Sequence, residues 1–300
     1  MTAKKTNVGS TIAKSDDGSI QITFNIPFSI IDENKKKAAN ELGKNLEVPG
    51  FRKGKAPLVK VIEQIPENTL LEKTLSGILP DLVSKAIDEH KIKPAVYPRF
   101  ELISAKEGEN WQIRALTCEL PGIKLGDYKT KIAGTSRAKA IWTPSSADPA
   151  EDKTDKEDQA KTRAEKEQAI ISALLESIDI NIPKLLIDEE VNSRLSRLLE
   201  RLEKMGLTLE SYLASISKTA EVLRSEYEKQ AHDAIALDLI LNKIAEKENI
   251  KVGEKEIVAA VAAGSADANM TEELHTPERR RFIEVILKRR KALDSLTALL

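Results

Sequence analysis

The residues best suited to contact another molecule lie in one short loop, Gly50-Phe51-Arg52-Lys53-Gly54-Lys55-Ala56-Pro57. Its cations are Arg52, Lys53 and Lys55. Gly50 and Gly54 permit tight backbone turns, and Pro57 is suited to the start of a helix. Such a loop can pair its cations with phosphates or carboxylates while Phe51 enters an apolar slot. A merely solvated turn fits the same residues, so the loop alone leaves both readings open.

A second group of cations lies near the C-terminus. It consists of Arg279, Arg280, Arg281, Lys288, Arg289, Arg290 and Lys291. Apolar residues alternate with them along the same stretch: Phe282, Ile286, Leu293 and Leu296. This pattern predicts an amphipathic helix with a solvated basic face. Contact with nucleic acid or with an acidic partner is the alternative.

Residue types that perform catalysis do not gather in any known pattern. His90, His232 and His275 are far apart, and none has a second ligand at metal-binding spacing. The sequence has no nucleophile elbow, P-loop, dinucleotide-binding or zinc-protease motif. Its carboxylates lie among lysines at helical spacing, where solvated ion pairs are the norm. We therefore expect no catalytic residue, no cofactor and no metal site, and hence no enzyme.

The composition favours long solvated helices. Of 300 residues, 41% are hydrophobic, 4% aromatic and 32% charged, and the net charge is -1. This balance excludes a chain that is basic throughout and coats nucleic acid. The single cysteine, Cys118, cannot form an internal disulfide and lies in a predicted strand. With no apolar leader and no membrane span in the sequence, we expect a cytoplasmic protein without membrane contact.

The first block, 1–120, is expected to form a small α+β domain. Apolar and polar residues alternate over Ser19–Ile26, and Asp16-Asp17-Gly18 predicts a hairpin turn to a strand around Val8–Lys14. Further along the chain we expect helices and then strands: Asp32–Leu46, a short helix after Pro57, Glu67–His90, Arg99–Ser104 and Asn110–Glu119. The order β-β-α-α-α-β-β implies a sheet whose strands come from both ends of the block.

The second block, 121–168, is expected to be a connecting arm and a flexible charged linker. Residues 143–168 contain no Val, Ile, Leu, Met, Phe, Tyr or Trp. Such a stretch buries too little apolar surface to offset the entropy lost on ordering. Its second half, from Lys161, is expected to fray into the following helix.

The third block, 169–300, is expected to be all-α. A helical seam recurs at steps of 4, 3, 4 and 3 through Val191, Leu195, Leu198, Leu202 and Met205. Gly206 predicts the end of that helix, and Thr219 predicts the N-cap of a long helix to about Lys247. A short helix is expected over Gly253–Ala263, and Thr276-Pro277 begins the last one. The long helix is expected to bury Leu223, Tyr227, Ala231, Ala234 and Leu241.

The loop Gly50–Pro57 resembles the ribosome-docking loop of the trigger factor family, bacterial chaperones that act at the peptide exit tunnel. The element order around the loop resembles the ribosome-binding domain of that family, and Pro121–Tyr128 resembles its exit. Other segments resemble the helical chaperone domain: Ile182–Glu190, Gly206–Leu213, Leu223–Tyr227 and Leu239–Glu248. The resemblance covers about 1–128 and 169–300. It implies an α+β ribosome-binding domain followed by an elongated, all-α chaperone domain, in a chain that is mostly helical.

The resemblance also implies a function. Phe51, Arg52 and Lys53, with Lys55 beside them, would dock on a large-subunit protein at the ribosomal exit tunnel, while Gly50, Gly54 and Pro57 shape the loop. Nascent or unfolded polypeptides would bind apolar side chains spread over the helical domain, without ATP. A homodimer off the ribosome is expected, as are roles in protein folding, protein transport and cell division.

One departure from the family is informative. Members normally carry an FKBP-type prolyl isomerase domain between the two parts, but only residues 129–168 are available here, and most of them are the apolar-free linker. We expect the isomerase domain and its activity to be missing. The alternative function is a helical adaptor that binds one protein or RNA through the basic helix Arg279–Lys291. An isomerase with a degenerate compact site is a third possibility.

Overall fold

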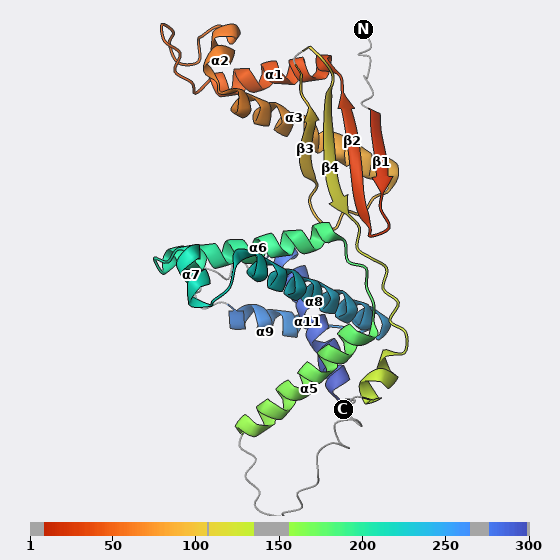
Figure 1. The fold of residues 1–300 in the computed structure, drawn as a ribbon. Coiled ribbons are helices and arrows are strands. Elements are labelled where there is room, and N and C mark those ends of the chain that lie inside the picture. Colours follow the sequence, from red (N-terminus) through yellow and green to blue (C-terminus); the bar gives the residue numbers. More distant parts are fainter. Residues whose placement is uncertain (1–8, 107, 135–155, 265–275, 299–300) are drawn as a thin grey trace, which may run out of the picture. The chain divides into compact units, whose positions relative to one another are not determined.

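The structure is a computed structural model that describes residues 9–106, 108–134, 156–264 and 276–298 (Figure 1). The chain divides into two compact units. One contains the residues up to Leu120 together with Pro183–Leu186, and the other contains the rest from Pro121 onward. We call them the N-terminal unit and the helical unit. Val8, His275 and residues 135–155 of the expected arm and linker lie outside the described ranges.

The N-terminal unit has the predicted order of elements. These are β1 (Gly9–Lys14), β2 (Ser19–Ile26), α1 (Phe28–Gly43), α2 (Leu58–Gln64), α3 (Glu67–His90), β3 (Arg99–Ser104) and β4 (Trp111–Cys118). The four strands form one antiparallel sheet in the order β1-β2-β4-β3. The last two strands of the unit thus complete a sheet that the first two begin, as the strand pattern predicts.

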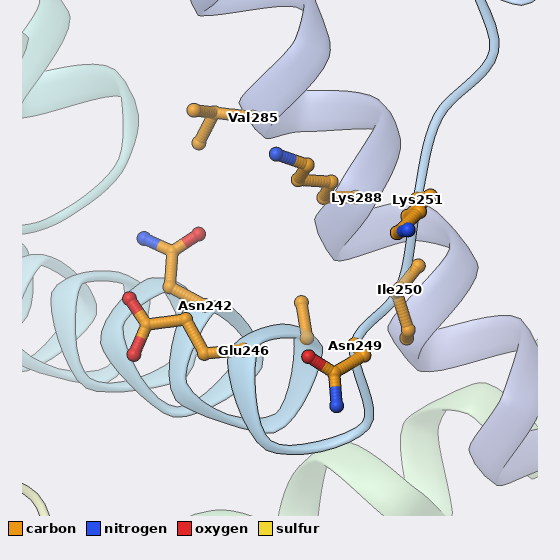
Figure 2. A pocket seen from close by; sticks show the side chains of 8 residues that line it. Asn242, Glu246, Asn249, Ile250, Lys251, Val285 and Lys288 are labelled. Atoms are coloured by element: carbon orange, nitrogen blue, oxygen red, sulfur yellow. The ribbon is translucent and has the colours of Figure 1, made fainter.

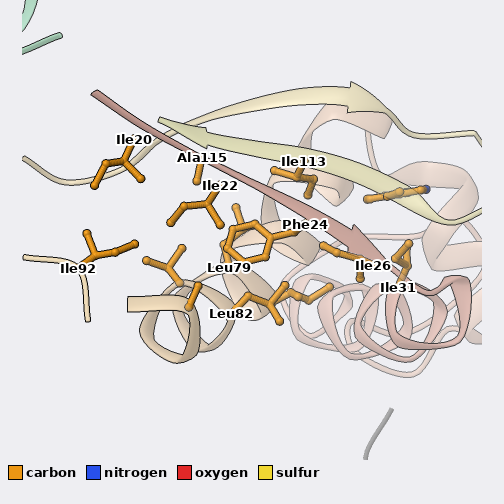
Figure 3. Close-up of a cluster of buried hydrophobic side chains, with 14 residues drawn as sticks. Ile20, Ile22, Phe24, Ile26, Ile31, Leu79, Leu82, Ile92, Ile113 and Ala115 are labelled. Atoms are coloured by element: carbon orange, nitrogen blue, oxygen red, sulfur yellow. The ribbon is translucent and has the colours of Figure 1, made fainter. Parts of the chain in front are cut away.

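The alternation of β2 decides which face of the sheet is buried. Ile20, Ile22, Phe24 and Ile26 are each at most 1% exposed. They pack with Ile113 and Ala115 of β4 and with apolar residues of α3, including Leu79 and Leu82 (Figure 3). Because every second residue of a strand points to the same face, one strand supplies four core side chains.

Helix α1 begins and ends earlier than the predicted Asp32–Leu46. It runs from Phe28 to Gly43 and starts directly after Pro27, whose φ of -59° suits a helix start. Ile31 is 1% exposed and belongs to the sheet-facing core. Burial of this β-branched residue outweighs its weak helix propensity, which is why the charge pattern alone placed the start too late.

The helical unit holds the remaining elements. Residues 128–134 are helical. The others are α5 (Lys156–Ser177), α6 (Lys184–Lys204), α7 (Leu209–Ser215), α8 (Ala220–Lys247), α9 (Glu254–Gly264) and α11 (Pro277–Thr297). Helix α11 packs against α8, α5 and α9. The expected fold class, a small α+β part followed by helices, is confirmed. Across the described ranges, no helix is both long enough and apolar enough to cross a bilayer.

Helix α5 corrects the expected extent of the linker. It begins at Lys156, so residues 156–168 are helical although they have no large apolar side chain. Their Lys, Glu, Gln, Ala and Arg residues have high helix propensity. Ion pairs hold the helix to α11: Arg163 lies 2.7 Å from Asp294, and Glu167 lies 3.0 Å from Arg290. Residues 156–168 are therefore stabilised as a helix by their helix propensity and by these ion pairs.

The predicted seam of α6 is right only in part. Val191, Leu198 and Leu202 are at most 9% exposed and Leu195 is half-buried, whereas Met205 is 55% exposed. The helix stops at Lys204, and Gly206 takes the left-handed conformation (φ 68°) that ends it. Met205 therefore leaves the helical face to which its spacing assigned it.

In α8 the predicted core is right only in part. Leu223, Ala231 and Leu241 are buried, while Tyr227 and Ala234 are half-buried. Other residues of α8 complete its buried face: Ala236, Ile240, Ile244 and Ala245. The predicted caps are present, since Thr219 and Thr276 accept hydrogen bonds from the backbone N–H groups of Val222 and Arg279.

Candidate functional site

The loop Gly50–Pro57 is a pair of tight turns between α1 and α2. The backbone N–H of Phe51 donates to the carbonyl of Val48 (3.1 Å), and that of Lys55 donates to the carbonyl of Arg52 (2.9 Å). Gly50 and Gly54 have φ values of 84° and 75°, which glycine adopts without strain. The two turns fold the loop into a defined shape.

A small apolar cluster, which we call the loop-base cluster, holds the loop's ends. Its buried members are Ala38, Ala39, Val48, Val61, Ile65 and Leu70. Half-buried Ala56 and Leu58 pack against it, so both sides of the loop are anchored. Pro57, with φ -60°, directly precedes α2. A Cβ on Gly43 would lie 2.8 Å from a methyl group of Val61, so α1 approaches α2 closely only because Gly43 lacks a side chain.

The tip of the loop combines exposed charge with one aromatic ring. Phe51 is 45% exposed, and Arg52, Lys53 and Lys55 are exposed. No carboxylate in the described part of the chain forms an ion pair with any of these three cations. Their charge therefore remains available to a partner, next to an apolar ring that is only partly covered.

The cations of α11 are in a different position, because acidic residues of the helical unit neutralise most of them. The pairs are Arg280–Glu254 (3.5 Å), Lys288–Glu284 (2.6 Å), Arg289–Asp238 (2.6 Å), Arg290–Glu167 (3.0 Å) and Lys291–Glu256 (2.7 Å). Lys291, followed by the Gly253 N–H, lowers the pKa of Glu256. The basic run that the sequence offers as a docking helix is therefore largely occupied in holding the helical unit together.

Exposed apolar side chains of the helical unit fall into two groups by the elements that carry them. One group is carried by α6, α8 and the α6–α7 connection, and includes Leu199, Met205, Leu207 and Val222. The other lies on α9 and α11 and includes Val258, Phe282, Val285 and Ile286. Sequence periodicity could not separate these residues from the core, because both kinds recur at helical spacing. Phe282, at 65% exposed, is the largest departure from a buried apolar stripe.

The segment that enters the helical unit is held by Tyr128, which is 2% exposed. Its hydroxyl donates to Oε1 of Glu248 (2.8 Å), and Nζ of Lys129 lies 2.6 Å from the same oxygen. Nζ of Lys247 lies 5.1 Å from the ring centroid. Burial, and then the hydrogen bond to Glu248, raise the pKa of Tyr128 to about 12. Lys129, followed by Tyr128, lowers the pKa of Glu248.

Residues with catalytic or metal-binding side chains stay apart in the structure. His90 lies 3.4 Å from the Ser10 hydroxyl, and His232 lies 3.4 Å from its neighbour Asp233. Burial raises the pKa of the Cys118 thiol at the end of β4. Within the described ranges, no three His, Cys, Asp or Glu side chains are grouped so that they could hold a metal ion.

Two family models match the chain in succession. One describes the bacterial trigger factor protein and matches residues 9–141, and the other describes the C-terminus of the same protein and matches residues 150–298. Together they leave only 142–149 between them. The isomerase domain expected at this position in the family therefore has no room in the chain.

Relatives and a solved structure give the same likeness. A trigger factor of Clostridium botulinum (strain Hall) is 22% identical over 410 aligned positions, covering 92% of this chain and 95% of the relative. That alignment is far longer than the chain, so a long stretch of the relative has no counterpart here. A trigger factor of Enterococcus faecalis is 37% identical over 108 residues, 36% of this chain and 25% of the relative. A trigger factor chaperone structure, studied for its promiscuous substrate recognition, has a TM-score of 0.60 at 15% identity and covers 97% of this chain and 99% of its own; it supports the fold.

Proposed function

Because the chain belongs to the trigger factor family and lacks the isomerase domain, we propose that it is an ATP-independent chaperone that docks at the ribosomal exit tunnel. The loop Gly50–Pro57 is the docking element, and its partner is a large-subunit protein beside the tunnel. One observation supports this proposal: the cations of the loop are exposed and form no ion pair with any described carboxylate, whereas those of α11 are largely neutralised within their own unit.

The chemistry of the loop suits a two-part contact. Arg52, Lys53 and Lys55 steer the loop toward an acidic surface, since unpaired exposed charges accelerate encounter. Phe51 then loses its remaining water contact in an apolar slot and slows dissociation. Because salt screens exposed charges, binding to ribosomes weakens as ionic strength rises.

Client polypeptides bind the exposed apolar side chains of the helical unit. An unfolded segment exposes apolar side chains that gain free energy when they leave water, and this requires no nucleotide. The two exposed groups, around Met205 and around Phe282, are the surfaces for this contact. Family membership further supports a cytoplasmic location, emerging and unfolded polypeptides as partners, and a homodimer when the chain is off the ribosome.

Prolyl isomerase activity is absent from this shortened member. The residues left between the two family matches are too few to build an aromatic-lined prolyl pocket. A proline-containing peptide in the cis form, mixed with the pure chain, should relax to trans at the uncatalysed rate. Acceleration by the chain, and not by a heat-denatured sample, would contradict this part of the proposal.

The decisive experiment is co-sedimentation with ribosomes. The wild-type chain is compared with the triple alanine variant of Phe51, Arg52 and Lys53, and with a second triple alanine variant at Arg279, Arg280 and Arg281. We expect the first variant to lose binding and the second to keep it, with the circular dichroism of both unchanged. Loss only in the second variant would favour the helical adaptor, and retention in both would refute docking through the loop.

A further inference from the structure

A groove of about 500 Å³ lies within the helical unit, between the C-terminal end of α8 and one face of α11 (Figure 2). We call it the α8–α11 groove. Its lining residues are Asn242, Ala245, Glu246, Asn249, Ile250, Lys251, Val285 and Lys288. It is open along one side, and most of the surface that lines it is apolar. A bound polypeptide segment could therefore lie in it with one side still facing solvent.

The carboxamide of Asn242 is held in one orientation. Nε of Arg289 donates to its Oδ1 at 2.8 Å, and Arg289 is itself fixed by an ion pair with Asp238 at 2.6 Å. Because the guanidinium can only donate, the oxygen of Asn242 must face it, and the NH2 group must be the free end. In the described part of the structure this NH2 has no acceptor. The side chain extends into the space between α8 and α11 (Figure 2).

A second carboxamide follows at the end of α8. Asn249 is exposed and has a left-handed backbone (φ 52°), with its N–H donating to the carbonyl of Glu246 at 3.2 Å. No described residue bonds to its side chain. Asn249 lies two residues beyond Lys247, the last residue of α8, so the two carboxamides stand on the helix and on the turn that ends it.

The remaining lining is apolar or already paired, except at Lys251, an exposed ammonium for which no described carboxylate forms an ion pair. Ala245, Ile250 and Val285 supply apolar surface, and Val285 is continuous along α11 with exposed Ile286 and Phe282. Lys288 is paired with Glu284 at 2.6 Å, and Glu246 with Lys243 at 2.9 Å. Lys251 is thus the one lining charge without a described counter-charge, too little to hold a polyanion, and the two carboxamides are the neutral polar groups left to bind a partner.

We propose that the α8–α11 groove binds an extended segment of unfolded polypeptide, with Asn242 and Asn249 donating to its backbone carbonyls. An apolar side chain of the segment packs on Ile250 and Val285. Every segment has carbonyls, and in an unfolded chain they lack protein partners, so this contact does not depend on sequence. The inference rests on the proposed chaperone function and adds recognition of the backbone to the general apolar contact.

The test measures binding of a fluorescent, capped peptide of alternating leucine and alanine to the full chain, by fluorescence anisotropy. In the double variant Asn242→Asp, Asn249→Asp, Arg289 keeps its acceptor while both NH2 donors become oxygens that repel carbonyls. We expect its Kd for the peptide to rise at least tenfold. The matched control, Asn192→Asp with Gln230→Glu, adds the same charge at exposed sites outside the groove and should bind as the wild type does.

A second probe separates backbone recognition from added charge. In this probe, ester linkages replace the amides and weaken the carbonyl acceptors. Wild type should bind it several-fold more weakly than the amide peptide, whereas the double variant should bind both alike. If the wild type binds the amide and ester peptides equally well, or if the double variant binds the amide peptide as the wild type does, the proposal that the groove recognises the backbone is wrong.

Suppression of aggregation of an unfolded client by the wild-type chain is measured in parallel. If the wild type suppresses aggregation and the double variant binds the peptide as tightly as the wild type does, the proposed role of the groove is refuted and the chaperone function stands. If the wild type neither suppresses aggregation nor binds the peptide, both proposals fail.

Discussion

Replacing Tyr128 by phenylalanine should destabilise the helical unit by an amount that depends on pH. The hydroxyl of Tyr128 donates to Oε1 of Glu248 at 2.8 Å, and the ring is 2% exposed. The Tyr128→Phe substitution removes this one hydrogen bond and keeps the buried ring. Glu248 retains Lys129 as a partner at 2.6 Å, so the carboxylate is not left without compensation.

The magnitude follows from two estimates. A hydrogen bond to a charged group contributes about 1.5–3 kcal/mol, and the lower end applies because Lys129 remains. The pKa of Tyr128 is raised from 10.0 to about 12 in the folded state. Since each pKa unit corresponds to about 1.4 kcal/mol, folding is favoured by up to ~3 kcal/mol while the tyrosine is neutral in both states. This contribution is complete below pH 10 and is lost as the pH rises toward 12, because the unfolded chain ionises first.

Two measurements check this prediction. Denaturant unfolding followed by circular dichroism should show Tyr128→Phe about 1.5 kcal/mol less stable at neutral pH, a difference that shrinks between pH 10 and 12. The ultraviolet absorbance of tyrosinate should show a late-titrating group in the wild type and in the control Tyr97→Phe, but not in Tyr128→Phe. A late phase that survives in Tyr128→Phe, or a stability difference that does not change with pH, would refute the reasoning.

Three further predictions concern the loop, the close approach of α1 to α2, and the N-cap of α8. Phe51→Ala should weaken ribosome binding about 40-fold, because roughly 90 Å² of exposed ring would lose its burial at ~25 cal/mol/Å². Tyr97→Ala, at a ring 77% exposed in the same unit, should leave binding in the sedimentation assay unchanged, and equal losses would argue against the loop. Gly43→Ala should destabilise the N-terminal unit by about 1–2 kcal/mol in denaturant unfolding, because the added Cβ would lie 2.8 Å from a methyl group of Val61. Adding Val61→Ala to the same chain should relieve this crowding, and if it does not, the loss of stability has another cause. Thr219→Ala should cost about 1 kcal/mol in thermal unfolding, whereas Thr219→Ser should not, and equal loss in both would show that the hydroxyl cap is not responsible.

Local patterns in the sequence predicted most of the fold. The alternation of β2, the stop at Gly206 and the caps at Thr219 and Thr276 depend on neighbouring residues, so they could be read without the structure. Boundaries that depend on distant partners could not. Helix α5 extends back to Lys156 in a stretch without large apolar residues, held to α11 by ion pairs that span more than a hundred residues of sequence.

The sequence alone also determined where the candidate docking loop lies, because its glycines, proline, cations and single aromatic residue are contiguous. Charge alone could not rank that loop above the basic run of α11, since both are rich in Arg and Lys, and in the sequence only the resemblance to the trigger factor family did so. The tertiary structure added a physical difference between them, by bringing Asp238 and Glu256 to α11 and no described carboxylate to Arg52, Lys53 or Lys55. The physical reason is that a charge is available to a partner only when no opposite charge of its own protein lies within reach, and that depends on how the chain folds.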